Sequence, residues 1–204
     1  MLRSEHAFTA CATLFLLALG HAAWAADFPV SSPDGKVAAR VAFDQKGGTV
    51  SYSVTSGGAV VIDNSPLGIT TSRGDFTVGM GLVGSEQVVV DETYTLPVGK
   101  RSTYVNRANE LVLTLRKNGQ DLRVQFRAYD DGVAFSYAIP GGGAIEISGE
   151  ASAFALAGGD ITYWGQAHPN NYGYETMLGR IDGERFSTPV LARLGERNHF
   201  LFLA

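Results

Sequence analysis

The stretch Val124–Tyr137 reads VQFRAYDDGVAFSY, and it decides the fold. Apolar and polar side chains alternate on both of its arms, and Asp130, Asp131 and Gly132 stand between the arms. This pattern predicts a β-hairpin. The two aspartates are also a candidate acidic site, but Asp is favoured in turns because its side chain hydrogen-bonds the nearby backbone. On the turn interpretation, we expect Gly132→Val to damage folding before function.

The segments before this hairpin have the same period of two. Leu111–Arg116 alternates, and Asn118-Gly119 joins it to the hairpin with a dipeptide that tolerates the positive φ values of a tight turn. Val37–Phe43 and Val50–Val54 alternate near the start of the chain. No stretch has helical periodicity long enough to predict a helix. The sequence therefore predicts an all-β domain.

The most polar stretch is Asp91–Glu110, DETYTLPVGKRSTYVNRANE. Pro97 and Gly99 lie in its middle, and both residues interrupt regular structure. We therefore expect it to be a long solvated connection between short upstream strands and the central meander.

Length and charge limit the classes of function. With 204 residues, the chain is long enough for one β domain of ordinary size. Its formal net charge of -4 and the lack of a basic stripe argue against nucleic acid or an anionic membrane as partner.

The first 25 residues have the pattern of a signal peptide. Arg3 precedes the apolar run Ala7–Leu19, and Ala23 and Ala25 are the small residues that a signal peptidase reads. We expect cleavage after Ala25 and export to the periplasm or the medium. The apolar run is shorter than the roughly 20 residues of a membrane span, so no span is expected after cleavage. Because the one cysteine, Cys11, lies in this segment, the mature chain is expected to have no disulfide and no thiol nucleophile.

Candidate binding residues gather in one stretch near the C-terminal end. Trp164, Asn171, Tyr172 and Tyr174 offer aromatic faces and an amide, which suit the mixed apolar and hydroxyl surface of a sugar. Glu175 beside them offers the oxygen ligand that calcium prefers. Aromatic loops also pack over sandwich cores, and Glu175 taken alone fits a surface acid better than a metal ligand. Both alternatives remain open at this point.

Two further features concern chemistry and the chain end. His168 has no second histidine at metal-ligand spacing, so a zinc site is not expected. The chain stops within the apolar strand-like sequence HFLFLA, whereas chain ends are usually polar, and we therefore expect a truncated domain.

Four motifs together resemble the N-terminal domain of glycoside hydrolase family 97. They are SPDGK at 32–36, DETYTLPVGKRS at 91–102, N-x-x-NEL at 106–111 and FRAYDDGVAFSY at 126–137. The resemblance implies a galactose mutarotase-like β-sandwich (a supersandwich) over residues 26–204, incomplete at its C-terminus. It also implies that a catalytic (β/α)8 barrel, which carries the catalytic residues in the family, is missing. No catalytic residue is therefore expected in this chain.

The resemblance further implies the function of a sugar-site scaffold in an exported α-glycosidase. Its expected partners are an α-linked oligosaccharide or galactoside and the catalytic barrel. Tyr174 and Glu175 match the position of a family glutamate that helps to bind calcium, so calcium is the expected cofactor, bound weakly by this chain alone. The alternative is a free-standing carbohydrate-binding sandwich whose Trp164, Tyr172 and Tyr174 stack on sugar rings. A mutarotase-type epimerase is a third possibility, but it needs an acid and base pair with histidine that the sequence does not show.

Overall fold

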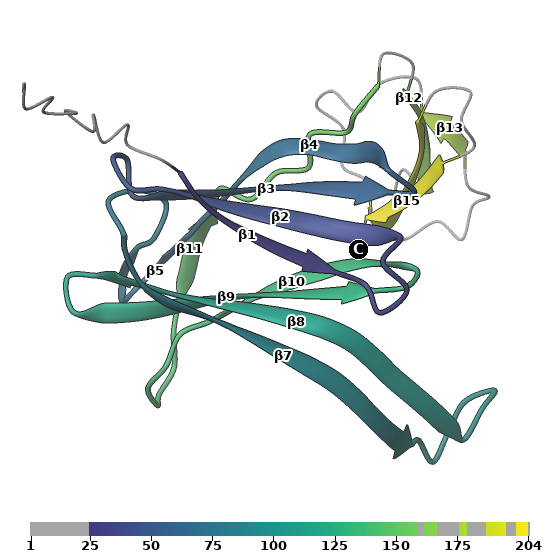
Figure 1. Cartoon of the computed structure of the whole chain (residues 1–204), viewed down its shortest axis with the longest axis horizontal. Helices are drawn as coiled ribbons and strands as arrows, with labels where there is room; N and C mark the ends of the chain where they lie inside the picture. Colours follow the sequence, from purple (N-terminus) through teal and green to yellow (C-terminus); the bar gives the residue numbers. More distant parts are fainter. Residues whose placement is uncertain (1–24, 159–160, 167–175, 179–186, 195–198, 204) are drawn as a thin grey trace, which may run out of the picture.

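The computed structural model describes residues 25–158, 161–166, 176–178, 187–194 and 199–203 (Figure 1). All regular structure in these residues is β-strand, and they contain no helix that could cross a membrane. The all-β prediction is therefore confirmed. The predicted signal peptide lies outside the described residues apart from Ala25, and the first strand begins at Ala26.

Two four-stranded antiparallel sheets form the body of the domain and face each other (Figure 1). The first has the order β1-β2-β3-β4 and the second the order β10-β9-β8-β7. The first sheet consists of β1 (Ala26–Ser31), β2 (Val37–Asp44), β3 (Thr49–Ser56) and β4 (Ala59–Leu67). The second consists of β7 (Gly81–Thr95), β8 (Thr103–Lys117), β9 (Gln120–Tyr129) and β10 (Gly132–Ala138).

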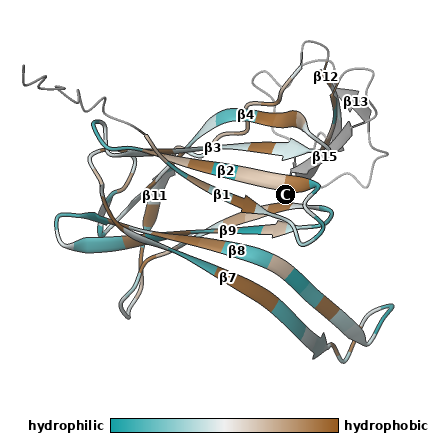
Figure 2. Cartoon of the chain, viewed as in Figure 1, coloured by the Kyte–Doolittle hydropathy of each residue, from teal (hydrophilic) through white to brown (hydrophobic). Residues whose placement is uncertain are grey.

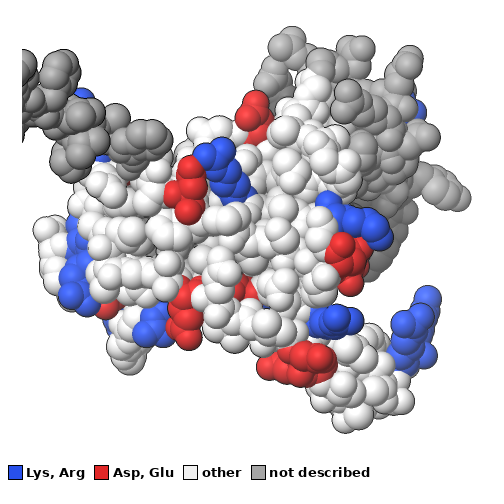
Figure 3. Space-filling model, in the orientation of Figure 1, with Lys and Arg blue, Asp and Glu red and all other residues white. Residues whose placement is uncertain are grey.

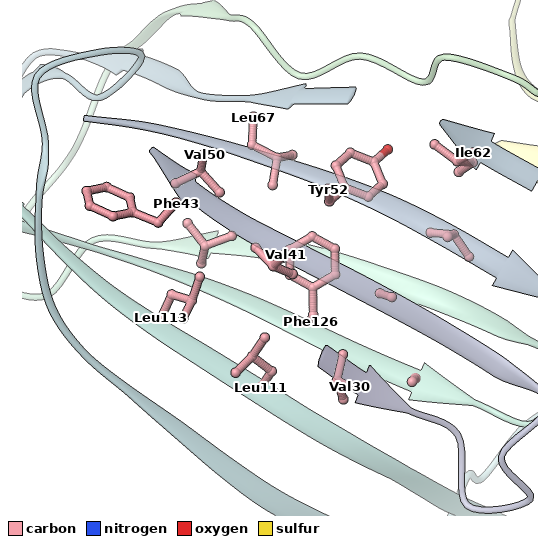
Figure 4. Packing of buried hydrophobic residues seen from close by; sticks show 14 of the residues in the cluster. Val30, Val41, Phe43, Val50, Tyr52, Ile62, Leu67, Leu111, Leu113 and Phe126 are labelled. Carbon is pink, nitrogen blue, oxygen red and sulfur yellow. The ribbon is translucent and has the colours of Figure 1, made fainter. Parts of the chain in front are cut away.

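The core lies between these sheets because alternate residues of each strand point to the same face. Val41 and Tyr52 come from the first sheet, and Leu111, Leu113 and Phe126 come from the second (Figure 4). All five are at most 2% exposed. The hydropathy colouring shows apolar residues alternating with polar ones along β8 (Figure 2). The period of two in the sequence thus reports the buried face directly.

The two turns of the central meander have the predicted positions. Asn118 and Gly119 have φ values of 51° and 77°, and they connect the paired residues Lys117 and Gln120. Both positive values match the type I′ turn that an Asn-Gly dipeptide favours. The prediction for this turn is confirmed.

The expected role of Gly132 was wrong. Gly132 pairs with Tyr129 across the turn at Asp130 and Asp131, so the hairpin itself is confirmed. However, Gly132 does not have a left-handed φ, and an added Cβ would meet no atom within 4 Å. We now expect Gly132→Val to be tolerated.

Backbone contacts close one end of the sandwich. Gly79 N donates to Gly47 O at 2.9 Å, and Met80 N donates to Gly48 O at 3.0 Å. Gly48 has a φ of +60°, and a Cβ there would lie 2.4 Å from Met80 N. Only glycine allows so close an approach of two backbones. The sheet β11-β5-β6 lies at this same end in Figure 1 and is formed by Ile147–Glu150, Ile69–Thr71 and Gly74–Asp75.

The fourth sheet has the order β13-β12-β14-β15 and lies at the opposite end of the sandwich (Figure 1). Its strands are β12 (Ile161–Gln166), β13 (Thr176–Leu178), β14 (Ser187–Leu194) and β15 (His199–Leu203). Leu194 is 6% exposed and belongs to the sandwich core. This sheet is therefore attached to the body through an apolar contact.

The prediction for Asp91–Glu110 was wrong. β7 and β8 have 14 paired positions from Gly81↔Arg116 to Thr95↔Thr103, and the outer eight, from Val88↔Glu110 onward, continue as an antiparallel ribbon. The sequence contained a signal for this ribbon, because β-branched and aromatic residues flank Pro97 and Gly99 on both sides. The polar composition concealed the signal, because the side chains of this part of β7 are exposed apart from Val90.

Candidate functional site

The end of the sandwich opposite the closed end brings together several family motifs. The β1–β2 turn and the β9–β10 turn meet here, where Asp34 N donates to Asp130 Oδ1 at 2.8 Å. The ribbon of β7 and β8 leaves the sandwich at this end, and the fourth sheet is attached here (Figure 1). We call this region the open end. The contact between the two turns gives Asp130 a structural role.

Asp34 organises the turn at the open end. Its carboxylate accepts hydrogen bonds from Lys36 N at 3.0 Å and Ser32 Oγ at 2.8 Å. It also pairs with Lys36 Nζ at 2.9 Å. These hydrogen bonds hold the pKa of Asp34 well below its usual value, and the hydrogen bond to Asp34 raises the pKa of Lys36. Asp34 is thus ionised at neutral pH and serves the turn.

A small cavity opens between the sheets at this end. It has a volume of about 120 Å³, and its lining includes Tyr52, Asp131, Phe154 and Leu194. Ligand pockets usually measure about 300–1,000 Å³. The cavity is therefore too small to enclose a saccharide unit with its contacts, and we interpret it as a packing space.

Five aromatic rings pack beside this cavity. Tyr52 lies 5.5 Å from both Phe126 and Phe135, measured between ring centroids, and Phe135 lies 5.9 Å from Tyr137 and 6.0 Å from Phe154. Burial raises the pKa of both tyrosine hydroxyls above the ordinary value. These hydroxyl groups are protonated at neutral pH and are available as hydrogen-bond donors.

Both hydroxyls form hydrogen bonds with the segment that lies along the outer edge of the first sheet. Tyr52 Oη donates to Ala153 O at 3.0 Å, and Tyr137 Oη lies 2.5 Å from Ser152 Oγ. Tyr137 Oη also accepts a hydrogen bond from Gly68 N at 3.0 Å. We therefore assign both tyrosines a structural role. None of the described residues forms a contact with them that would suggest a role in catalysis.

The outer face of the second sheet carries a polar surface that the sequence analysis missed. Glu110 and Arg127 are paired across β8 and β9, with Arg127 Nε 2.5 Å from Glu110 Oε2. This hydrogen bond raises the pKa of Arg127. Two shallow hollows of about 300 and 450 Å³ share Glu110 and Gln125 in their linings. The signal was the alternation itself, which puts Glu110, Gln125 and Arg127 on the face opposite the leucines of the core.

One of the five predicted site residues, Trp164, lies within the described part of the chain. Trp164 belongs to β12, where its backbone pairs with Met177 and Leu191. Asn171, Tyr172, Tyr174 and Glu175 lie outside the described residues. Within the described ranges, no three His, Cys, Asp or Glu side chains gather as a metal site. The sugar and calcium assignments therefore stay predictions.

Comparison with a family model gives the relationship of this chain. The model described as "Glycosyl-hydrolase 97 N-terminal" matches residues 30–203. The "Probable retaining alpha-galactosidase" of Streptomyces bingchenggensis is 38% identical over 157 residues, which are 74% of this chain and 24% of the relative. The "Retaining alpha-galactosidase" of Bacteroides thetaiotaomicron is 31% identical over 111 residues, which are 54% of this chain and 16% of the relative.

Solved structures agree with the match. A glycoside hydrolase family 97 enzyme from Pseudoalteromonas sp. strain K8, in complex with panose, has a TM-score of 0.70 and 28% identity, covering 82% of this chain and 27% of that chain. A β-arabinopyranosidase has a TM-score of 0.72 and 29% identity, covering 87% of this chain and 31% of that chain. The chain thus spans less than a third of the length of these relatives. It belongs to glycoside hydrolase family 97 and corresponds to the N-terminal domain of that family.

Proposed function

We propose that this chain acts as the N-terminal scaffold domain of an exported α-glycosidase and contributes to the sugar site without catalysing cleavage alone. The observation that carries the proposal is the coverage: the match to the relative named a probable retaining α-galactosidase spans 74% of this chain but 24% of that relative. Glycoside hydrolysis generally needs two carboxylates that face each other across the scissile bond. We assign these groups to the catalytic part of the enzyme.

The proposed sugar contacts are Trp164, Asn171, Tyr172 and Tyr174. The position of β12 supports this assignment, because β12 lies in the fourth sheet at the open end and its last residue, Gln166, precedes the stretch that contains the other three residues. The ligand class is an α-linked oligosaccharide or galactoside. The names of the curated relatives make an α-galactoside the first ligand to test.

The proposed calcium ligand is Glu175. A carboxylate oxygen suits this hard cation, which takes six to eight oxygen ligands. One glutamate supplies two oxygens at most, so further ligands would come from the catalytic part and from water. We therefore propose weak binding by the chain alone and stronger binding in a complete enzyme.

Titration calorimetry of the purified chain with α-galactosides and with maltose tests the sugar assignment. We expect binding at millimolar ligand that Trp164→Ala abolishes. Tyr94→Ala, which removes a half-exposed aromatic ring on the ribbon, is the control and should leave binding unchanged. Absence of heat with every ligand would reject sugar binding by the chain alone.

Calcium titration of the same chain tests the metal assignment. Glu175→Gln removes the carboxylate and should abolish binding, whereas Glu150→Gln alters an exposed carboxylate on β11 and should not. Equal calcium affinity in the two variants would reject Glu175 as a ligand.

If sugar binding proves tight without any catalytic part, the free-standing carbohydrate-binding module would be the better interpretation.

A further inference from the structure

Exposed apolar side chains concentrate on the ribbon, which we define as residues 88–105 of β7, β8 and their connecting loop. Of the eleven large apolar side chains that are exposed in the described part of the chain, six lie on the ribbon. They are Val88, Val89, Tyr94, Leu96, Val98 and Val105. By the strand register, Val89 and Val105 lie on the face that continues the core, whereas Val88 and Tyr94 lie on the opposite face. Exposed apolar side chains that gather in one element often mark an interaction surface.

The ribbon continues the core face of the sandwich beyond the facing sheet. Asn109 Nδ2 donates to Ser31 O at 2.7 Å, and Gln87 Nε2 donates to Pro29 O at 2.8 Å. These two hydrogen bonds mark the border where β1 ends. Past this border, the same face carries Val89 and Val105, which are 76% and 68% exposed, together with the polar pair Asp91 and Arg107. Exposed apolar side chains therefore continue on this face beyond the sheet that could bury them.

The ribbon is ordered by its own contacts. The rings of Tyr94 and Tyr104 stack with centroids 5.6 Å apart, and Asn106 Nδ2 donates to Glu92 Oε2 at 3.0 Å. Leu96 N donates to Ser102 O at 2.9 Å across the tip. A partner would thus meet a preformed surface, which lowers the entropic cost of binding.

The tip adds a charge pattern to the apolar surface. The loop between β7 and β8 contains Lys100 and Arg101 and no carboxylate, and it also contains Val98, which is 79% exposed. In Figure 3 the ribbon projects away from the body, with Lys and Arg at its outer part. The complementary surface is an apolar depression bordered by carboxylates.

We propose that the ribbon is a docking arm that seats on the catalytic part of a family 97 enzyme. The choice of occupant follows from length: the chain spans 24% and 27% of two relatives, so most of each relative's length belongs to other parts that a domain of this kind would adjoin. The ribbon extends from the open end, where the proposed sugar contacts are also expected. The docking arm therefore fixes the position of the scaffold relative to the catalytic groups, and this inference rests on the proposed function.

A chimera tests the docking arm. This chain, from Ala26, replaces the matching segment of the Streptomyces bingchenggensis relative. The ribbon variants are Val89→Ser, Val98→Ser and Val105→Ser, and the matched controls are Val60→Ser and Val78→Ser, whose side chains are each 50% exposed away from the ribbon. Melting temperature is measured for every variant in both the chimera and the isolated chain, and α-galactosidase activity is measured in the chimera.

We expect each ribbon substitution to lower the melting temperature of the chimera by about 1–2 °C and the controls to leave it within about 0.5 °C, because a chain of several hundred residues shifts less per kcal/mol than a small domain. In the isolated chain, all five substitutions should fall within about 2 °C of the parent, because the side chains are already exposed.

Three other outcomes would each contradict the docking arm, and one of them would also contradict the proposed function. An active chimera whose ribbon variants behave like the controls would overturn the docking arm and leave the proposed function standing. A chimera without activity would overturn both. An isolated chain that sediments as a dimer, and becomes monomeric in the ribbon variants, would make a second copy the occupant and would overturn docking on the catalytic part.

Discussion

The two halves of β8 have opposite environments although they belong to one continuous strand. Leu111, Leu113 and Leu115 lie under the first sheet and are at most 1% exposed. Val105, on the same face nearer the tip, is 68% exposed because no strand covers it. The strand geometry is the same in both halves. The two halves differ in whether another sheet packs against them. Apolar alternation in the sequence therefore indicates which side chains share a face, but it does not indicate whether that face is buried.

The largest expected effect comes from the covered half. Leu113→Ala removes a fully buried side chain and should lower the free energy of unfolding by about 2–5 kcal/mol, through lost burial and a cavity. Val105→Ala on the same strand should cost less than about 0.5 kcal/mol. Urea denaturation measures both. Similar losses of unfolding free energy in the two variants would mean that the ribbon is buried in solution. The contrast between a covered and an uncovered half of β8 would then be wrong.

The next effect lies at the border between the halves. Glu110→Ala removes the partner of Arg127 and should cost about 1–2 kcal/mol, less than a buried pair because the Arg127 side chain is 40% exposed. Glu110→Gln keeps one acceptor and should cost less than the alanine substitution. The same urea series measures this difference. A glutamine variant as unstable as the alanine variant would show that the charge, and not the hydrogen bond, matters.

The uncovered half depends on its own cross-strand contacts. Tyr104→Ala removes the stacked pair with Tyr94 and should destabilise the ribbon by about 0.5–1.5 kcal/mol. Tyr104→Phe retains the ring and serves as the control. Hydrogen exchange of ribbon amides measures the local change. If exchange accelerates equally in the core strands, the ribbon and the sandwich unfold as one unit, and the two halves are not separable.

The smallest effect concerns acid stability at the open end. The folded-state pKa of Asp34 lies below its unfolded value, so its contribution to stability is present above about pH 4 and decreases as the pH falls below that value. Asp34→Asn should therefore flatten the pH dependence of the melting temperature below pH 4, while Asp44→Asn, in the turn at the closed end, is the comparison. If the melting temperature of Asp34→Asn falls below pH 4 as steeply as that of the parent, Asp34 does not contribute to the acid dependence of stability.

The sequence predicted the covered half well and the uncovered half poorly. Alternation at Val37–Phe43 and Leu111–Arg116 located core strands, because burial selects apolar residues at every second position. The Asn118-Gly119 turn followed from its φ requirements. Asp91–Glu110 was predicted as a connection because a strand without a covering sheet need not alternate in hydropathy.

Only the chemistry of the candidate site could be proposed from the sequence. Trp164 was predicted as an aromatic contact for sugar, and the structure places its backbone in β12. The contact between Asp34 and Asp130 joins residues 96 positions apart, and no local pattern reveals such a partner. Predicting that Glu110 and Arg127 form a pair requires the register of β8 and β9. That register follows from the hairpin turns only once both turns have been located.

The length of β8 sets how far the ribbon reaches. At about 3.4 Å per residue, the 15 residues of β8 span roughly 50 Å, whereas the eight residues of β2 in the facing sheet span roughly 27 Å. The two sheets are joined at both ends, by Met80 N donating to Gly48 O at the closed end and by Asp34 N donating to Asp130 Oδ1 at the open end. Roughly 20 Å of β8 is therefore in excess of what a strand of the facing sheet can cover.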